Sequence, residues 1–190
     1  VNLSAGGGTQ AEQTGAIMIR FEEHLMKNPT YLVLVVGDVT STMACAITAQ
    51  KIHVKVAHVE AGIRSNDWTM PEEINRLVTD AITNYFFTTS EVANKTLRES
   101  GYGDDQIFFV GNCMIDTLLA NRPRFIKPTI WEELGLREKG YFMMTLHRPA
   151  NVDEGAKLKE LMDEIINNTE EMPLVFPVHP RTKKMLNELG

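Results

Sequence analysis

Carboxylates gather in one short part of this 190-residue chain, the stretch HVEAGIRSNDWTMPEEINR at residues 58–76. Glu60 directly follows an apolar run, and Glu72 and Glu73 open a later helical pattern. Asp38 follows another apolar run upstream. Positioned carboxyl groups can take a proton from a substrate and return it. The stretch is therefore either a charged surface or part of a site that handles protons.

Histidine and arginine follow two apolar runs in the last third of the chain. His147 and Arg148 come after YFMMTL, and His179 and Arg181 come after PLVFPV. A guanidinium group can hold a phosphate through two parallel hydrogen bonds, and helix N-termini add backbone N–H donors. Together with the carboxylates, these residues predict acid–base chemistry on a phosphorylated or nucleotide-bearing ligand.

These residues also have structural interpretations. An Asp between a strand and a helix, such as Asp38, can cap the helix. Glu72 and Glu73 would be stabilised by the dipole of a first helical turn. A lone strand-end histidine such as His147 is more often structural than catalytic. Glu60 has no helix start beside it to cap, which makes it the strongest catalytic candidate.

Short apolar runs alternate with helical periods along the chain. The predicted strands cover residues 30–36, 54–59, 84–89, 106–112, 141–147 and 173–179, and the predicted helices 11–28, 40–52, 71–82, 90–101, 154–168 and 181–190. This alternation predicts an α/β fold with parallel sheets and helices on both faces. The apolar run at 30–36 is typical of a strand covered on both faces. Ligands of such sheets bind outside the carboxyl ends of the strands, where the candidate residues lie.

The alternation breaks between residues 122 and 140, where two prolines and a basic cluster surround one short helical pattern. We expect residues 1–121 to be the remainder of an N-terminal Rossmann-like domain, 122–140 a linker, and 141–190 the start of a second Rossmann-like domain.

Composition narrows the function classes. A net charge of −6 argues against nucleic acid or an anionic membrane as the main partner. The two cysteines, Cys45 and Cys113, are far apart and suit a reducing cytoplasm. No P-loop, HExxH or clustered Cys/His set occurs, so a catalytic metal is not expected. No apolar run is long enough to span a membrane. The absence of an initiator Met suggests an excerpt of a longer chain.

Five motifs follow one another along the chain, namely VVGDVTSTMA, HVEAGIRS, MPEEINRLVTD, FVGNCMIDTLL and TLHRPANVD. In this order they resemble the non-hydrolysing UDP-N-acetylglucosamine 2-epimerases from about residue 9 to 181. The resemblance implies a glycosyltransferase-B-like architecture of two Rossmann-like domains, the second binding UDP. It also implies incompleteness at both ends, because the family's opening GTRPE-like turn and its later DSGGxQEE-like segment are absent.

The implied reaction converts UDP-GlcNAc to UDP-ManNAc by anti elimination of UDP, which gives a 2-acetamidoglucal, and re-addition of UDP. The resemblance also implies that no cofactor is needed, neither NAD nor a metal. The family's acid–base carboxylates fall on Asp38, Glu60 and Glu72, and its histidine, which would contact the diphosphate or help UDP leave, falls on His147. The candidates for substrate binding or loop ordering are Glu73, Arg76, Arg148, His179 and Arg181. The implied partners are a UDP-sugar, a second copy of the chain in a homodimer and, as in bacterial relatives, an allosteric UDP-GlcNAc.

Three other functions stay open. The substrate could be a modified UDP-sugar, such as a diacetamido uronic acid. The same architecture also serves retaining glycosyltransferases. The chain could finally be a nucleotide-sugar-binding fragment without catalysis.

Overall fold

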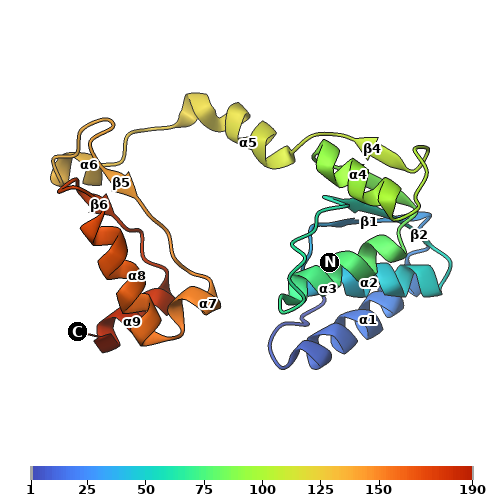
Figure 1. Ribbon diagram of the computed structural model, residues 1–190. Helices are drawn as coiled ribbons and strands as arrows, with labels where there is room; N and C mark the ends of the chain where they lie inside the picture. Colours follow the sequence, from blue (N-terminus) through green and yellow to red (C-terminus); the bar gives the residue numbers. More distant parts are fainter. Residues whose placement is uncertain (1, 190) are drawn as a thin grey trace. The chain divides into compact units, whose positions relative to one another are not determined.

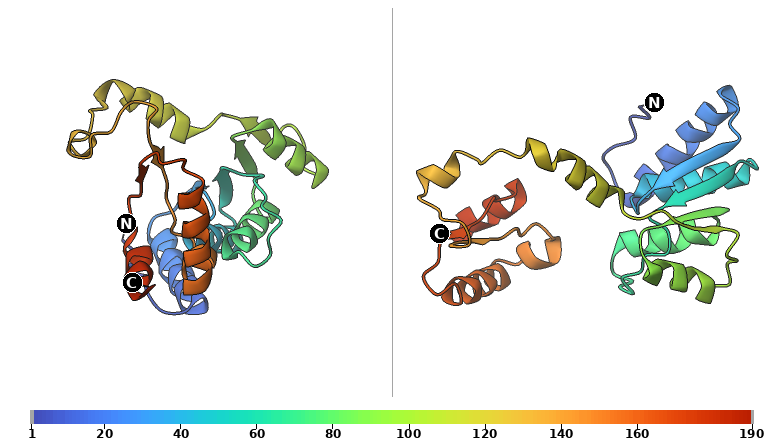
Figure 2. Two further views of the ribbon diagram at one scale, coloured as in Figure 1. Left: turned by 60° about the vertical axis from the view of Figure 1, so that its left-hand side comes forward. Right: turned by 90° about the horizontal axis from the view of Figure 1, so that it is seen from above.

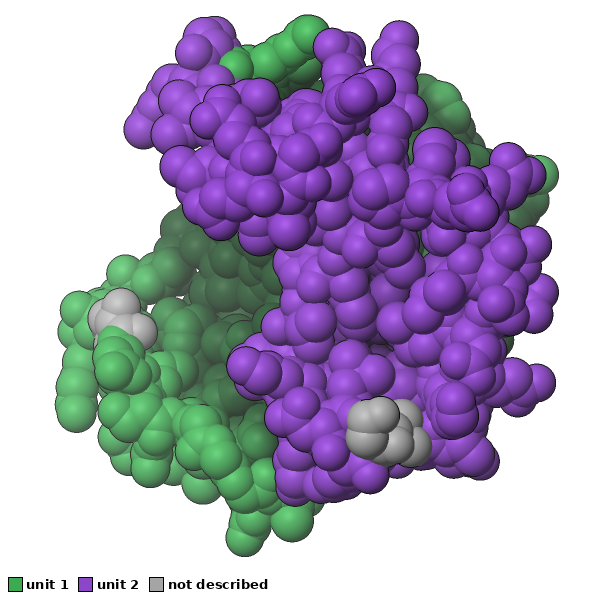
Figure 3. All heavy atoms as spheres, turned by 90° about the vertical axis from the view of Figure 1, so that its left-hand side faces the viewer, with its two compact units in different colours: residues 1–122 green, residues 123–190 purple. Residues whose placement is uncertain are grey.

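The computed structural model describes residues 2–189, with the side chains of all but 149, 150 and 189. It divides into two compact units, one ending at Arg122 and the other beginning at Pro123 (Figure 3). The bounds proposed for the two domains and their linker stay a prediction. The predicted last helix, 181–190, ends at a residue outside the described ones.

The first unit alternates helices and strands from its first helix onward (Figure 1). Its elements are α1 (Gln10–Lys27), β1 (Leu32–Val36), α2 (Thr40–Lys51), β2 (Lys55–Val59), α3 (Pro71–Ala81), β3 (Tyr85–Thr88), α4 (Glu91–Glu99), β4 (Ile107–Phe109) and α5 (Cys113–Asn121). The four strands are parallel in the order β1-β2-β3-β4. The predicted α/β class with a parallel sheet is confirmed.

Local capping sets several helix starts. Thr9 and Glu12 form a reciprocal capping box at the start of α1. Ser90 is the N-cap of α4 and accepts a hydrogen bond from the Ala93 N–H. Gly101, with φ +94°, follows the end of that helix. These capping contacts fix where the helices begin and end. The turns that connect strands to helices carry the candidate residues.

The helices α1 to α4 pack on one face of this sheet. The register aligns Val33 with Val56, which share a core with Leu25 of α1 and two alanines of α2. It also aligns His58, bound to α3, with Phe86, which packs on Leu97 of α4. All these side chains point to the same side, because neighbours in a parallel register share a face.

The opposite face of β1 is open, which corrects two predictions. Leu34 and Val36 are each 55% exposed, whereas Val33 and Val35 are buried. The strand at 30–36 is therefore covered on one face only, and the described helices do not cover both faces of the sheet. A run of apolar residues cannot distinguish the two cases, since it looks alike whether or not the second face is covered.

Helix α5 buries none of its residues and lies away from the sheet in both Figure 1 and Figure 2. Its N-cap Asn112 accepts a hydrogen bond from the Met114 N–H. The sequence interpretation assigned no helix there.

The second unit is smaller. It contains α6 (Ile130–Glu133), β5 (Phe142–Met143), α7 (Pro149–Val152), α8 (Gly155–Asn167), β6 (Leu174–Val175) and α9 (Pro180–Leu189), and a 3-10 turn, η1 (Arg122–Arg124), joins the units. Its two strands pair in parallel. Each is shorter than the strand predicted from the sequence, at 141–147 and 173–179. Helix α7 was not predicted. In the described part of the chain, no helix has the length and hydropathy to cross a membrane.

Candidate active site

The carboxyl ends of β1 and β2 lie side by side in the first unit and carry Asp38 and Glu60. The Gly37 N–H donates to the carbonyl oxygen of Val59 across 3.0 Å, which joins the two strand ends. A Cβ built on Gly37 would lie 3.8 Å from Oε2 of Glu60. The Glu60 carboxylate thus lies beside the backbone that precedes Asp38, as expected for the ligand-binding edge of a parallel sheet.

Asp38 does not cap a helix. The N-cap of α2 is Val39, and that position makes no side-chain capping bond. The Asp38 carboxylate instead forms a short ion pair with the guanidinium group of Arg76 on α3. Its backbone carbonyl accepts from Nδ2 of Asn75, 2.8 Å away. The Asp38 side chain is 37% exposed, so its carboxylate contacts Arg76 and is still accessible from solvent.

Glu60 has a backbone conformation that side chains other than glycine seldom adopt. Its φ is +72°, in the left-handed region, and its N–H donates to the Phe87 carbonyl across 3.0 Å. Such a conformation costs a non-glycine residue about 1 kcal/mol or more and is concentrated at functional sites. The turn after β2 therefore retains a strained glutamate where a glycine would be less costly.

Glu73 is 1% exposed and holds the loop between the other two glutamates. It accepts from the backbone N–H groups of Ser65 and Asn66 and from Arg76, at 2.9 to 3.0 Å. Burial acts to raise the pKa of Glu73, but the hydrogen bonds from Ser65, Arg76 and Asn66 outweigh it and lower the pKa to about 2. These partners occupy both of its oxygens, so this geometry favours loop ordering over substrate contact.

Glu72 differs from its neighbour. It is exposed in the first turn of α3, where Pro71 is the first helical residue, and its carboxylate makes no hydrogen bond to the described part of the chain. It is thus free to meet a ligand. Asp38 and Glu60 follow neighbouring strands and Glu72 opens the next helix, while Arg76 of that helix forms ion pairs with both Asp38 and Glu73.

Helix α3 turns a polar stripe toward the sheet. Glu73, Arg76 and Asp80 are buried at spacings of three and four residues, whereas Ile74, Leu77 and Val78 are only partly buried. A surface helix usually does the opposite. The polar side chains of α3 must therefore be satisfied by one another and by the strand ends.

Three further polar residues of this network were not identified from the sequence. Asp80 binds His58 of β2 at 2.7 Å and Arg64 of the loop at 2.6 Å, and also accepts from the Gly62 N–H. The i, i+3, i+7 spacing that links Asp80 to Glu73 and Arg76 was the available signal.

In the second unit, His147 and His179 follow β5 and β6, with ring centroids 6.3 Å apart. Thr182 donates to the carbonyl oxygen of Leu146 at 2.6 Å, which fixes the start of α9 beside the first histidine. The Arg181 guanidinium group is engaged by both oxygens of Asp153, one of them at 2.6 Å from Nε. Arg148 is exposed. The two histidines therefore lie near each other, while Arg181 already has an anionic partner.

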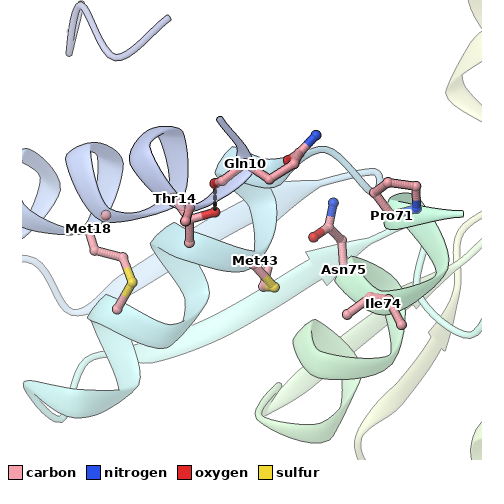
Figure 4. Close-up of a pocket in the computed structure, with 9 residues that line it drawn as sticks. Gln10, Thr14, Met18, Met43, Pro71, Ile74 and Asn75 are labelled. Atoms are coloured by element: carbon pink, nitrogen blue, oxygen red, sulfur yellow. Dashed lines mark hydrogen bonds between the residues drawn. The ribbon is translucent and has the colours of Figure 1, made fainter. Parts of the chain in front are cut away.

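A pocket of about 510 Å³ lies between α1, α2 and α3 (Figure 4). Its lining is mainly apolar and comprises Gln10, Ala11, Thr14, Gly15, Met18, Met43, Pro71, Ile74 and Asn75. Only Asn75 connects it to the strand ends, through the carbonyl of Asp38. None of the carboxylates at the strand ends lines it, so the candidate site is the sheet edge and not this pocket. No group of three or more potential metal ligands occurs in the residues described.

Comparisons with known proteins identify the family of the chain. The UDP-N-acetylglucosamine 2-epimerase family profile matches residues 1–190. The chain is 40% identical over its whole length to the UDP-N-acetylglucosamine 2-epimerase of Methanocaldococcus jannaschii, covering 53% of that protein. It is 38% identical to the UDP-2,3-diacetamido-2,3-dideoxy-D-glucuronate 2-epimerase of Pseudomonas aeruginosa, covering 99% of this chain and 53% of the relative.

The fold agrees as well. The crystal structure of the M. jannaschii UDP-GlcNAc 2-epimerase in complex with UDP-GlcNAc and UDP matches with a TM-score of 0.82 and 39% identity, covering 99% of this chain and 53% of that one. The predicted fold class is confirmed, and the chain spans about half the length of the curated relatives it matches. By its profile, its relatives and its fold, this chain belongs to the UDP-N-acetylglucosamine 2-epimerase family.

Proposed function

We propose that the full-length protein epimerises UDP-N-acetylglucosamine at C2 to UDP-N-acetylmannosamine. The single observation that carries the proposal is that the strained Glu60 lies beside the backbone that precedes Asp38, at the carboxyl ends of β1 and β2. Family membership supplies the substrate class, because a solved relative is described in complex with UDP-GlcNAc and UDP. Inversion at C2 requires that a proton is removed from one face and returned to the other, a task that positioned carboxyl groups can perform.

In the proposed reaction, one carboxylate removes the C2 proton, the C1–O bond breaks, and UDP leaves with the electron pair. The product of this step is a 2-acetamidoglucal. A second carboxyl group then protonates C2 on the opposite face while UDP adds again at C1. We assign Asp38, Glu60 and Glu72 to this acid–base set, without dividing the two faces among them.

The second unit supplies the groups for the diphosphate in this proposal. His147 and His179 lie together at the strand ends, and Arg148 is exposed beside them. Protonated imidazole and guanidinium groups stabilise the charge that develops on departing UDP. Arg181 would have to exchange Asp153 for phosphate. A homodimer and an allosteric UDP-GlcNAc belong to the same proposal and rest on the family resemblance.

The test is NMR of the purified full-length protein with UDP-GlcNAc in D2O. Turnover through proton removal places solvent deuterium at C2 of the product, and product without this label would contradict the proposal. Glu60→Gln removes one carboxyl group of the acid–base set with little change in shape and should lower kcat at least 100-fold. Glu22→Gln, at an exposed position of α1, is the matched control and should leave kcat unchanged.

A second candidate substrate is a UDP-diacetamido uronic acid. It is favoured by the 38% identity to the Pseudomonas aeruginosa epimerase, which is close to the identity with the M. jannaschii enzyme. The two candidates are distinguished by kcat/KM, measured for each nucleotide sugar with the full-length protein. A higher value for the UDP-diacetamido uronic acid than for UDP-GlcNAc would favour this second candidate. The same assay with sugar acceptors tests a glycosyltransferase, which would require an acceptor. UDP binding with no turnover would indicate a binding fragment.

A further inference from the structure

His58 is a fully buried imidazole of β2 with a partner at each ring nitrogen. Its Nδ1 lies 2.7 Å from Oδ1 of Asp80, and its Nε2 lies 2.9 Å from the carbonyl oxygen of Gly37. Gly37 also donates its own N–H to Val59. The residue before Asp38 is thus fastened to β2 through both of its backbone polar groups.

The partners determine which ring nitrogens carry protons. A carbonyl oxygen only accepts hydrogen bonds, so Nε2 of His58 must be the donor to Gly37. Oδ2 of Asp80 already accepts from the Gly62 N–H at 3.0 Å and from Arg64 at 2.6 Å. Two such donors stabilise an ionised carboxylate, which can only accept from Nδ1. His58 therefore carries a proton on both nitrogens, as an imidazolium between a carboxylate and a carbonyl.

Asp80 extends this contact to the turn that carries Glu60. Gly62, whose N–H it accepts, lies two residues after Glu60. The hydroxyl of Tyr102 donates to the backbone carbonyl of Asp80 at 3.0 Å, which anchors the end of α3. One carboxylate thus connects the turn after β2 directly, and the end of β1 through His58.

We propose that His58 and Asp80 are positioning residues for the C2 epimerase reaction. They set the separation of the Asp38 and Glu60 carboxylates by fastening both strand ends to α3, with His58 as an imidazolium. This inference rests on the proposed function. A displacement of about 1 Å at reacting groups can lower a rate about 100-fold, so a buried contact that touches no substrate can still govern kcat.

Two substitutions of His58 in the full-length protein separate its two contacts. Gln places an amide nitrogen near the position of Nε2 and keeps the donor to Gly37, whereas Asn places one near Nδ1 and keeps only the contact with Asp80. His58→Asn should lower kcat about 10- to 100-fold with KM changed less than about 3-fold, and His58→Gln should retain more of kcat. If both folded variants keep kcat within about 2-fold of the wild type, the proposal is wrong.

A second measurement uses the wild type and does not depend on the folding of the two His58 variants. In the NMR spectrum of full-length wild type with 15N-labelled histidine, His58 should show protons on both ring nitrogens. Asp80→Asn should remove the Nδ1 proton and leave the Nε2 proton, because the amide can donate to a neutral ring. A single ring proton in the wild type would overturn the assignment. Failure of the wild type to epimerise would contradict the proposed function, while the ring spectrum still decides the state of His58.

Discussion

Glu60 combines a carboxylate with a left-handed backbone, at φ +72°, beside Gly37 at the end of β1. Neither feature benefits folding, since a left-handed residue is less costly as glycine and a half-buried carboxylate loses hydration. The position is therefore better explained by a role in binding or catalysis than by a role in stability.

Two variants of Glu60, one with glycine and one with alanine, measure the free-energy cost of its left-handed backbone. Glu60→Gly should give a free energy of unfolding about 1 kcal/mol higher than Glu60→Ala, because only glycine adopts this φ without steric cost. Both variants lack the carboxylate and should lose the proposed activity equally. Urea unfolding of the two full-length variants provides the comparison. Equal stabilities would mean that the left-handed turn is not maintained in solution.

Glu73 predicts a pH dependence of stability. Its pKa lies at about 2, below the ordinary value of 4.5, so its contribution is fully present above about pH 4.5 and is lost as the pH falls toward 2. Glu73→Gln has no carboxylate at this position, so it has no such contribution to lose when the pH falls. The wild type should therefore lose more unfolding free energy than this variant between about pH 5 and pH 2. Denaturant titrations at several pH values measure both free energies of unfolding. An equal loss in the wild type and in Glu73→Gln would contradict the prediction.

At the residue scale, the sequence identified the site in part. Asp38, Glu60 and Glu72 were located because each directly follows a strand or opens a helix, which is a local property. The partner of Asp38 lies 38 residues away, and such pairing depends on how α3 packs on the sheet. Glu73 and Arg76 were candidates from the sequence, but the pairing of Arg76 with Asp38 could not be assigned before the structure.

At the scale of elements, α3 shows why pattern alone was insufficient. Its apolar residues suggest an inward face of Ile74, Leu77 and Val78, yet the buried stripe is Glu73, Arg76 and Asp80. Both stripes have helical spacing, so periodicity predicts the helix but not its orientation. The strands and most helices were predicted to within a few residues. The uncovered face of β1 was not predicted, because burial on the second face depends on residues elsewhere.

The turn after β2 is joined to α4 through Gly62. A Cβ on this residue would lie 2.6 Å from the Ala93 carbonyl oxygen, and its φ is +78°. Gly62→Ala should therefore lower the free energy of unfolding by about 3 kcal/mol, combining overpacking against backbone with the left-handed cost.

Gly101→Ala is the matched control for this prediction. Its φ is +94°, but no atom lies within 4 Å of the added Cβ, so only the backbone cost of about 1 kcal/mol applies. Thermal or urea unfolding should rank the wild type first, then Gly101→Ala, then Gly62→Ala. Equal losses would show that the turn can move away from α4, and would weaken the claim that it fixes Glu60.

At the scale of the whole molecule, each unit carries one part of the proposed chemistry. The first unit holds the acid–base carboxylates, and the second holds two neighbouring histidines at its strand ends. The formal charge of −6 does not oppose an anionic substrate, because a few local cationic groups can bind phosphates whatever the net charge.

Apolar side chains exposed on two elements predict how the 190-residue chain behaves in solution. Leu34 and Val36 share one face of β1, and Leu118 and Leu119 lie on α5, all between 54% and 56% exposed. Clustered apolar surface binds hydrophobic dyes and promotes self-association, unlike single exposed residues. The chain should therefore enhance the fluorescence of 1-anilinonaphthalene-8-sulfonate and show a concentration-dependent size in light scattering. Leu34→Thr combined with Leu119→Gln should reduce both signals, whereas Val92→Thr, at an isolated exposed position of α4, should change neither. A folded chain that binds no dye would contradict the open face of β1, since no other described element covers those side chains.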